Sequence, residues 1–169
     1  MRLNHEARPA ADPGAAAGPA GEAAGEPVAF VLELPSDLDV IEGAVAYLVD
    51  RCRGARFDGS RLTLNFRVGM CEALANAVIY GNRRDPGKCV RVEVELSSSR
   101  VAVCVRDQGE GFEPGEVPDP TLPENLERSG GRGIFLLHKL MDEVRYNERG
   151  NEVRFVLHCG EPLRRASGE

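Results

Sequence analysis

The chain has 169 residues, with 27 acidic and 21 basic side chains, which gives a formal net charge of −6. One domain of this length buries enough surface to fold without a disulfide or a structural metal, and the acidic balance argues against nucleic-acid binding, which needs a basic stripe. Its five scattered cysteines lack metal-ligand spacing and no apolar run is long enough to cross a membrane, so we expect a cytoplasmic protein with reduced thiols.

Both ends of the chain are rich in Ala, Gly and Pro and almost free of large apolar residues. Ordering such segments costs conformational entropy that no burial offsets, so residues 1–27 and 160–169 are predicted to be disordered tails. Residues 28–159 between them are expected to form the single folded domain.

The first half of this domain begins with a strand and continues with two helices. Apolar and other residues alternate over Phe30–Leu34, which predicts the strand. Ser36 is the expected N-cap of a first helix that ends at Gly54. Apolar residues four apart predict a second, amphipathic helix over Arg61–Tyr80, which stops at Gly81 and Asn82.

The second half contains two pairs of strands separated by a helix. Alternation predicts strands over Val90–Leu96, Val101–Val105, Val144–Tyr146 and Val153–Leu157, and a helix over 134–141. Charged residues alternate with apolar ones in these strands, so the sheet has one face on the core and one in water, which excludes a doubly wound Rossmann sheet. The element order predicts an α/β fold of the α+β, two-layer sandwich type, with a mixed, mainly antiparallel sheet and the helices on one face.

A polar pair interrupts the second helix. Glu72 and Asn76 are four residues apart and therefore share one helical face. The carbonyl oxygen of an Asn side chain suits Mg²⁺, and a carboxylate one turn away can accept a proton. The plainer interpretation of this pair is an exposed polar helix face.

Two glycine-rich segments follow the second helix. Asp107 comes directly after an apolar strand and precedes Gly109 and Gly111, so its carboxylate can accept a hydrogen bond from an amine such as N6 of adenine. Gly130–Gly133 precedes the last helix, whose free N–H groups, with Arg132, make an anion site. The plainer interpretations are an ordinary turn and a flexible glycine hinge with a solvated arginine.

The order of these segments resembles that of the GHKL ATPases. In that superfamily, residues 72–76 correspond to the N box, 107–111 to the first glycine box and 130–133 to the second. The resemblance covers about residues 28–158 and implies a Bergerat-type ATPase fold that binds ATP with Mg²⁺. It also implies an ATP lid at about residues 112–130.

The resemblance also implies a role for each matching residue. Asn76 holds Mg²⁺ against the phosphates, Asp107 reads adenine, and Glu72 is the general base that acts on a Ser or Thr hydroxyl. The residues implied to bind the nucleotide are Asn76, Asp107, Gly109, Gly111, Gly131, Arg132 and Gly133.

The segment Gly130–Val144 is typical of one subgroup, the small bacterial anti-sigma factor serine/threonine protein kinases. This implies a kinase that binds a sigma factor, phosphorylates an anti-sigma antagonist of the STAS type, and forms a homodimer through its first strand and helix. Tyr80 stands where these kinases usually have His. An alternative is therefore a non-catalytic, ATP-gated module that sequesters a regulatory partner.

Overall fold

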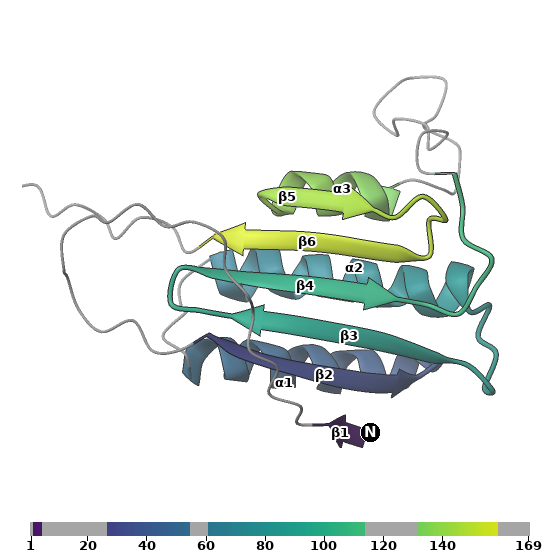
Figure 1. Ribbon diagram of the computed structural model, residues 1–169, viewed down its shortest axis with the longest axis horizontal. Helices are drawn as coiled ribbons and strands as arrows, with labels where there is room; N and C mark the ends of the chain where they lie inside the picture. Colours follow the sequence, from purple (N-terminus) through teal and green to yellow (C-terminus); the bar gives the residue numbers. More distant parts are fainter. Residues whose placement is uncertain (1, 5–26, 55–60, 114–131, 159–169) are drawn as a thin grey trace, which may run out of the picture.

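The computed structural model describes residues 2–4, 27–54, 61–113 and 132–158, and these ranges form one sheet with helices on one side (Figure 1). The strands are β1 (Arg2–Asn4), β2 (Val28–Pro35), β3 (Cys89–Leu96), β4 (Arg100–Arg106), β5 (Glu143–Tyr146) and β6 (Glu152–His158). The helices are η1 (Leu38–Val40), α1 (Ile41–Gly54), η2 (Arg61–Phe66), α2 (Arg67–Asn76), η3 (Ala77–Gly81) and α3 (Arg132–Leu140).

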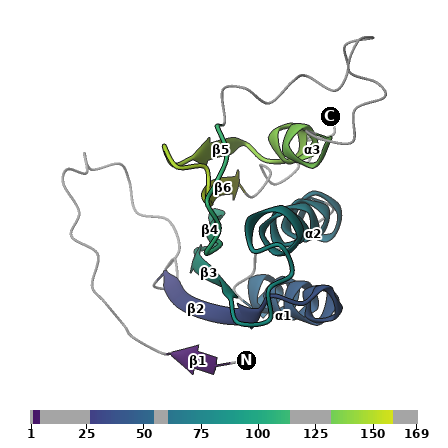
Figure 2. The same ribbon diagram turned by 90° about the vertical axis from the view of Figure 1, so that its right-hand side faces the viewer.

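The sheet has the strand order β1-β2-β3-β4-β6-β5, and every pairing in the described residues is antiparallel. Figure 2 shows α1, α2 and α3 side by side on one face of this sheet, with α2 in the middle. The predicted two-layer sandwich, with a mainly antiparallel sheet and helices on one face, is confirmed. Among the described residues no helix is long and apolar enough to cross a membrane.

The predicted second helix is one continuous helical run from Arg61 to Gly81, formed by η2, α2 and η3. Its middle is α-helical, and both ends are wound as π-helix. The apolar row expected to face the core is buried throughout: Leu62, Phe66, Met70, Leu74 and Val78. The helix therefore lies where its spacing of apolar residues predicts.

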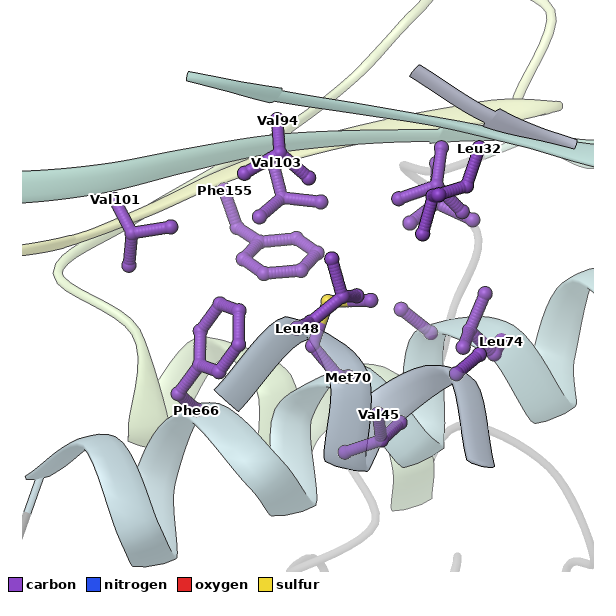
Figure 3. Close-up of a cluster of buried hydrophobic side chains, with 14 of the residues drawn as sticks. Leu32, Val45, Leu48, Phe66, Met70, Leu74, Val94, Val101, Val103 and Phe155 are labelled. Carbon is purple, nitrogen blue, oxygen red and sulfur yellow. The ribbon is translucent and has the colours of Figure 1, made fainter. Parts of the chain in front are cut away.

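The core lies between the sheet and this helical layer, as Figure 3 shows. Val103 and Phe155 point from the strands toward Phe66 and Met70 on the long helix, and Leu32 lies on the side of Leu74. All six side chains are at most 3 % exposed. Burial of each such side chain contributes about 1.5–3 kcal/mol. The alternation of apolar and polar residues in the strands thus fixes which sheet face meets the helices.

Two local expectations need correction. Asp37, not Ser36, caps the first helical segment, because the helix starts with the 3-10 turn η1 and Asp39 N donates to Asp37 Oδ1 at 3.0 Å. The disordered tail predicted over residues 1–27 does not hold for Arg2–Asn4, which pair with β2, whose edge offers unpaired backbone groups. Residues 5–26 and 160–169 lie outside the described residues.

Candidate functional site

A cavity of about 490 Å³ lies where the C-terminal part of the long helix meets β4, β6 and the start of α3. Most of its wall is apolar, with Val105, Ile134 and Val153 among the lining residues. The residues proposed from sequence that line it are Glu72, Asn76, Asp107, Gly111, Arg132 and Gly133. Gly109 lies beside Asp107, and Gly131 is outside the described residues.

Asp107 stands at one end of the cavity, directly after β4. Its N–H donates to Asn151 O at 3.0 Å, and its Oδ1 accepts from Gly109 N at 2.7 Å. The carboxylate packs on Gly81, where a Cβ atom would overlap it, and a Cβ atom at Gly109 would overlap the Gly81 carbonyl. These two glycines thus allow the helix end and the loop after β4 to touch.

The environment of Asp107 suits a buried polar ligand. Burial raises the pKa of this carboxyl above its usual value of 3.8, and the hydrogen bond from Gly109 and the charges of Lys88 and Arg149 offset part of that effect. Among the described residues, the Gly109 N–H donates to Oδ1 of this carboxylate. A ligand amine is the group that satisfies a half-buried carboxylate oxygen.

Asn82 is a site residue that sequence reasoning treated only as part of a helix stop. It is fully buried, its Nδ2 donates to Cys89 O at 3.0 Å, and its Oδ1 accepts from Gln108 N at 2.8 Å. One side chain therefore joins the helix end, the start of β3 and the loop that carries Asp107. No local sequence pattern signals these contacts.

The turn between β5 and β6 packs against the segment Gly109–Gly111. Arg149 donates to Gly109 O at 3.2 Å. Gly111 has φ 84° and Gly150 has φ 73°, and a Cβ atom at either would overlap a backbone carbonyl of the opposite segment. Both the backbone angle and the close contact therefore require glycine here.

Glu152 is a second residue that the sequence reading missed. Its side chain is 7 % exposed, and its carboxylate accepts hydrogen bonds from Arg106 and, at 2.8 Å, from Arg154. Burial tends to raise the pKa of Glu152, but the hydrogen bonds from both arginines outweigh it and lower the pKa below 4.5. Since Arg106 precedes Asp107, this contact fixes the end of β4 beside β6.

Glu72 and Asn76 stand at the other end of the cavity, one helical turn apart on α2. The start of α3 packs on both of them. A Cβ atom at Gly133 would lie only 2.6 Å from Glu72 Oε2 and 3.2 Å from Asn76 Nδ2. The N–H groups of this first turn give a positive field beside the carboxylate and the amide, and Arg132 lines the same end.

Aromatic side chains complete the cavity wall. Tyr80 is 66 % exposed, and Tyr146 packs edge-to-face against Phe112 with ring centroids 5.4 Å apart. Burial raises the pKa of Tyr146 to about 12, so its hydroxyl is neutral at physiological pH. Sequence alternation placed Tyr146 on a strand without linking it to the site.

Comparison with known protein families shows to which class of protein this chain belongs. The histidine kinase-like ATPase domain matches residues 34–157, most of the chain. The chain belongs to the histidine kinase-like ATPase family. The resemblance to GHKL ATPases seen in the sequence is therefore confirmed.

The chain is also similar to curated proteins named anti-sigma F factor and serine-protein kinase RsbW. The anti-sigma F factor of Anoxybacillus flavithermus is 37 % identical over 84 residues, which cover 48 % of this chain and 57 % of the relative. The serine-protein kinase RsbW of Staphylococcus epidermidis is 29 % identical over 111 residues, 61 % of this chain and 70 % of the relative. The anti-sigma F factor of Clostridium perfringens is 28 % identical over 97 residues, which cover 55 % of this chain and 69 % of the relative. The matched segments thus span between 57 % and 70 % of the length of these relatives.

Membership of this ATPase family implies ATP binding, and the cavity fits that ligand. Its volume of about 490 Å³ lies in the range of small-molecule sites. It also offers a carboxylate oxygen for an amine at one end and a helix start with an arginine for an anion at the other. The described residues contain no cluster of three or more His, Cys, Asp or Glu that holds a metal without help from a ligand.

Proposed function

We propose that the protein is an ATP-dependent serine/threonine protein kinase that acts as an anti-sigma factor. The observation that carries the proposal is the pairing of Glu72 with Asn76 beneath the start of α3, at the opposite end of one cavity from Asp107. The names of the relatives, anti-sigma F factor and serine-protein kinase RsbW, support this assignment.

ATP lies along the cavity in this proposal. The N6 amine of adenine donates a hydrogen bond to the Asp107 carboxylate, and Gly109 and Gly111 keep the backbone close to the flat base. The phosphates extend toward Asn76, the N–H groups at Arg132 and Gly133, and Gly131 before them. The guanidinium of Arg132 adds a charged donor for a phosphate oxygen.

Asn76 is the proposed protein ligand of Mg²⁺. Because the described residues offer no acidic cluster, the remaining ligands are phosphate oxygens and water, a coordination that is common for Mg²⁺. The ion, when bound, neutralises charge on the phosphates during transfer. The amide oxygen of Asn76 fixes the position of the triphosphate on α2.

Glu72 is the proposed general base. It takes the proton of the acceptor Ser or Thr hydroxyl while the oxygen of that hydroxyl bonds to the γ-phosphorus and the bond to the β-phosphate oxygen breaks, which releases ADP. Gly133 leaves the carboxylate accessible, because a larger side chain there would overlap it.

The acceptor we propose is an anti-sigma antagonist of the STAS type, and a sigma factor is the second partner. This follows from the resemblance to the small anti-sigma kinases and from the names of the relatives. In the same proposal the kinase domain spans residues 28–159, the ATP lid about residues 112–130, and two copies pair through the first strand and helix in the cytoplasm.

A second function, an ATP-gated binding module without transfer, is favoured by one observation. Tyr80 stands at the cavity wall, 66 % exposed, where kinases of this subgroup usually have His. In this alternative ATP changes the affinity for a partner and no phosphoprotein forms.

The test uses the STAS-domain proteins encoded by the source genome, purified and incubated with γ-labelled ATP and Mg²⁺. We expect wild type to label one of them on Ser or Thr, and Glu72→Gln to lose at least about a hundredfold in rate, as removal of a general base does. Glu95→Gln, on the exposed face of β3, is the matched control and keeps the full rate. Partner binding that responds to ATP without labelling would favour the gated module instead.

A further inference from the structure

The outer face of the long helix carries a row of apolar residues, of which Cys71 and Ala75 also pack against the core. We call Leu64, Val68, Cys71, Ala75 and Ile79 the outer stripe; the spacing of three or four residues places them on one helical side. All five side chains are at least partly exposed, and Leu64 is 61 % exposed.

The other sides of this helix already have apolar partners. The sheet side is buried in the core through Leu62, Phe66 and Met70. On the side of α3, Gly69 lies so close to that helix that a Cβ atom there would lie 3.2 Å from Leu137. No described element covers the side of the long helix that faces away from the sheet (Figure 2).

The exposed large apolar side chains lie on the long helix or beside the cavity. In the described residues the large hydrophobic side chains that remain exposed are Leu64, Tyr80 and Phe112. Leu64 and Tyr80 lie on the long helix, while Tyr80 and Phe112 line the cavity. The outer stripe is continuous with the cavity, because Ala75 and Ile79 line it as well.

We propose that the outer stripe is the docking surface for the protein that receives the phosphate, and that this protein presents apolar side chains beside its acceptor Ser or Thr. This inference rests on the proposed kinase function. Glu72 is adjacent in sequence to Cys71 and one turn or less from Val68 and Ala75. A protein hydroxyl that reaches Glu72 therefore brings its neighbouring residues onto the stripe.

The length and charge of the stripe define the partner further. It extends roughly 20 Å from Leu64 to Ile79, at about 1.5 Å per residue, which matches a helix or strand of a folded protein. Arg67, on the same helix, forms an ion pair with Glu42 at 3.6 Å. Because the stripe itself contains no charged residue, docking depends on apolar contact and is only weakly sensitive to salt.

The experiment compares Leu64→Asp and the milder Val68→Ser with wild type, using the purified STAS-domain proteins of the source genome as acceptors. Ser98→Asp, in the exposed turn between β3 and β4, is the control for added charge. We expect the KM for the acceptor to rise at least tenfold in Leu64→Asp and less in Val68→Ser. The kcat at saturating acceptor, the affinity for ATP and the melting temperature stay near those of wild type.

Three results overturn the inference, each in a different way. If both stripe variants keep the wild-type KM while Glu72→Gln abolishes transfer, the kinase proposal stands and the docking surface is elsewhere. If Leu64→Asp turns a dimer into a monomer in sedimentation, a second copy covers the stripe. If wild type labels no STAS protein, the proposed function fails and the docking inference fails with it.

Discussion

Position 81 requires glycine for a reason other than its backbone angles. The left-handed angles at the end of the long helix belong to Arg83 and Arg84, both with φ 56°, whereas Gly81 remains within η3. Gly81 lacks a side chain because the Asp107 carboxylate occupies that space. The sequence predicted where the helix ends, but the reason for the glycine is a contact with a residue far along the chain.

Gly81→Ala should therefore impair nucleotide binding. The methyl group displaces the Asp107 carboxylate, and we expect ATP affinity to fall at least about tenfold, the loss associated with one hydrogen bond to a charged group. Titration calorimetry measures this effect. Gly43→Ala on α1 is the control, since its Cβ meets nothing within 4 Å, and it should leave affinity unchanged and raise stability by up to about 1 kcal/mol.

Asp107 also gives the site a pH dependence. Burial raises the pKa of its carboxyl above 3.8, and only the ionised form accepts a hydrogen bond from an amine through either oxygen. ATP affinity should thus fall as the pH drops through this raised pKa, at a higher pH than an ordinary Asp would give.

Affinity measured between pH 7 and pH 4 checks this prediction for Asp107. The Asp107→Asn variant reports the contribution of adenine protonation, because an amide does not titrate in this range. Identical pH profiles of wild type and Asp107→Asn would show that the carboxylate does not contact the base.

At the scale of elements, the carboxylate of Asp142 connects its own loop with η2 and β6. Asp142, between α3 and β5, accepts from Arg61 of η2 at 2.7 Å through Oδ1 and from His158 N of β6 at 2.7 Å through Oδ2. Burial tends to raise the pKa of Asp142, but these hydrogen bonds outweigh that effect and lower it below 3.8. The carboxylate thus stabilises the folded state above its unfolded pKa, and this contribution is lost as the pH falls through the lowered pKa.

Asp142→Asn should lower stability at neutral pH by about 1 kcal/mol, the typical value for a partly exposed, hydrogen-bonded ion pair. The difference from wild type should shrink as the pH falls through the lowered pKa of Asp142, because the wild-type carboxyl then becomes protonated. Urea unfolding at pH 7 and at pH 2.5 measures both values. A constant difference at both pH values would mean that the charge of Asp142 contributes nothing.

The sequence predicted most elements because their patterns are local. Alternation in β3, β4 and β6 follows from a sheet with one buried face, and the row from Leu62 to Val78 follows from a helix on that face. The pairing of β1 with β2 and the contacts of Asn82 were not predictable in this way. They join segments distant in sequence, and no local spacing encodes them.

At the scale of the whole molecule, the fold brings together residues from α2, the end of β4, the start of α3 and the β5–β6 turn. Periodicity alone gave the positions of Glu72 and Asp107 on their elements but not their shared cavity. Their grouping was expected from the order of the motifs and the family resemblance. The supporting contacts of Asn82, Arg149 and Glu152 were missed, because polar residues in turns and at strand ends have many possible roles.

The most direct test of the account is the affinity of Mg²⁺-ATP for wild type, Asp107→Asn and Glu72→Gln, measured by titration calorimetry. We predict that Asp107→Asn binds at least about tenfold more weakly, because a buried hydrogen bond to the base is lost. Glu72→Gln should bind within about threefold of wild type, since a general base stabilises the transition state and not bound ATP. Equal binding by wild type and Asp107→Asn, or a large loss in Glu72→Gln, would contradict this division of the cavity.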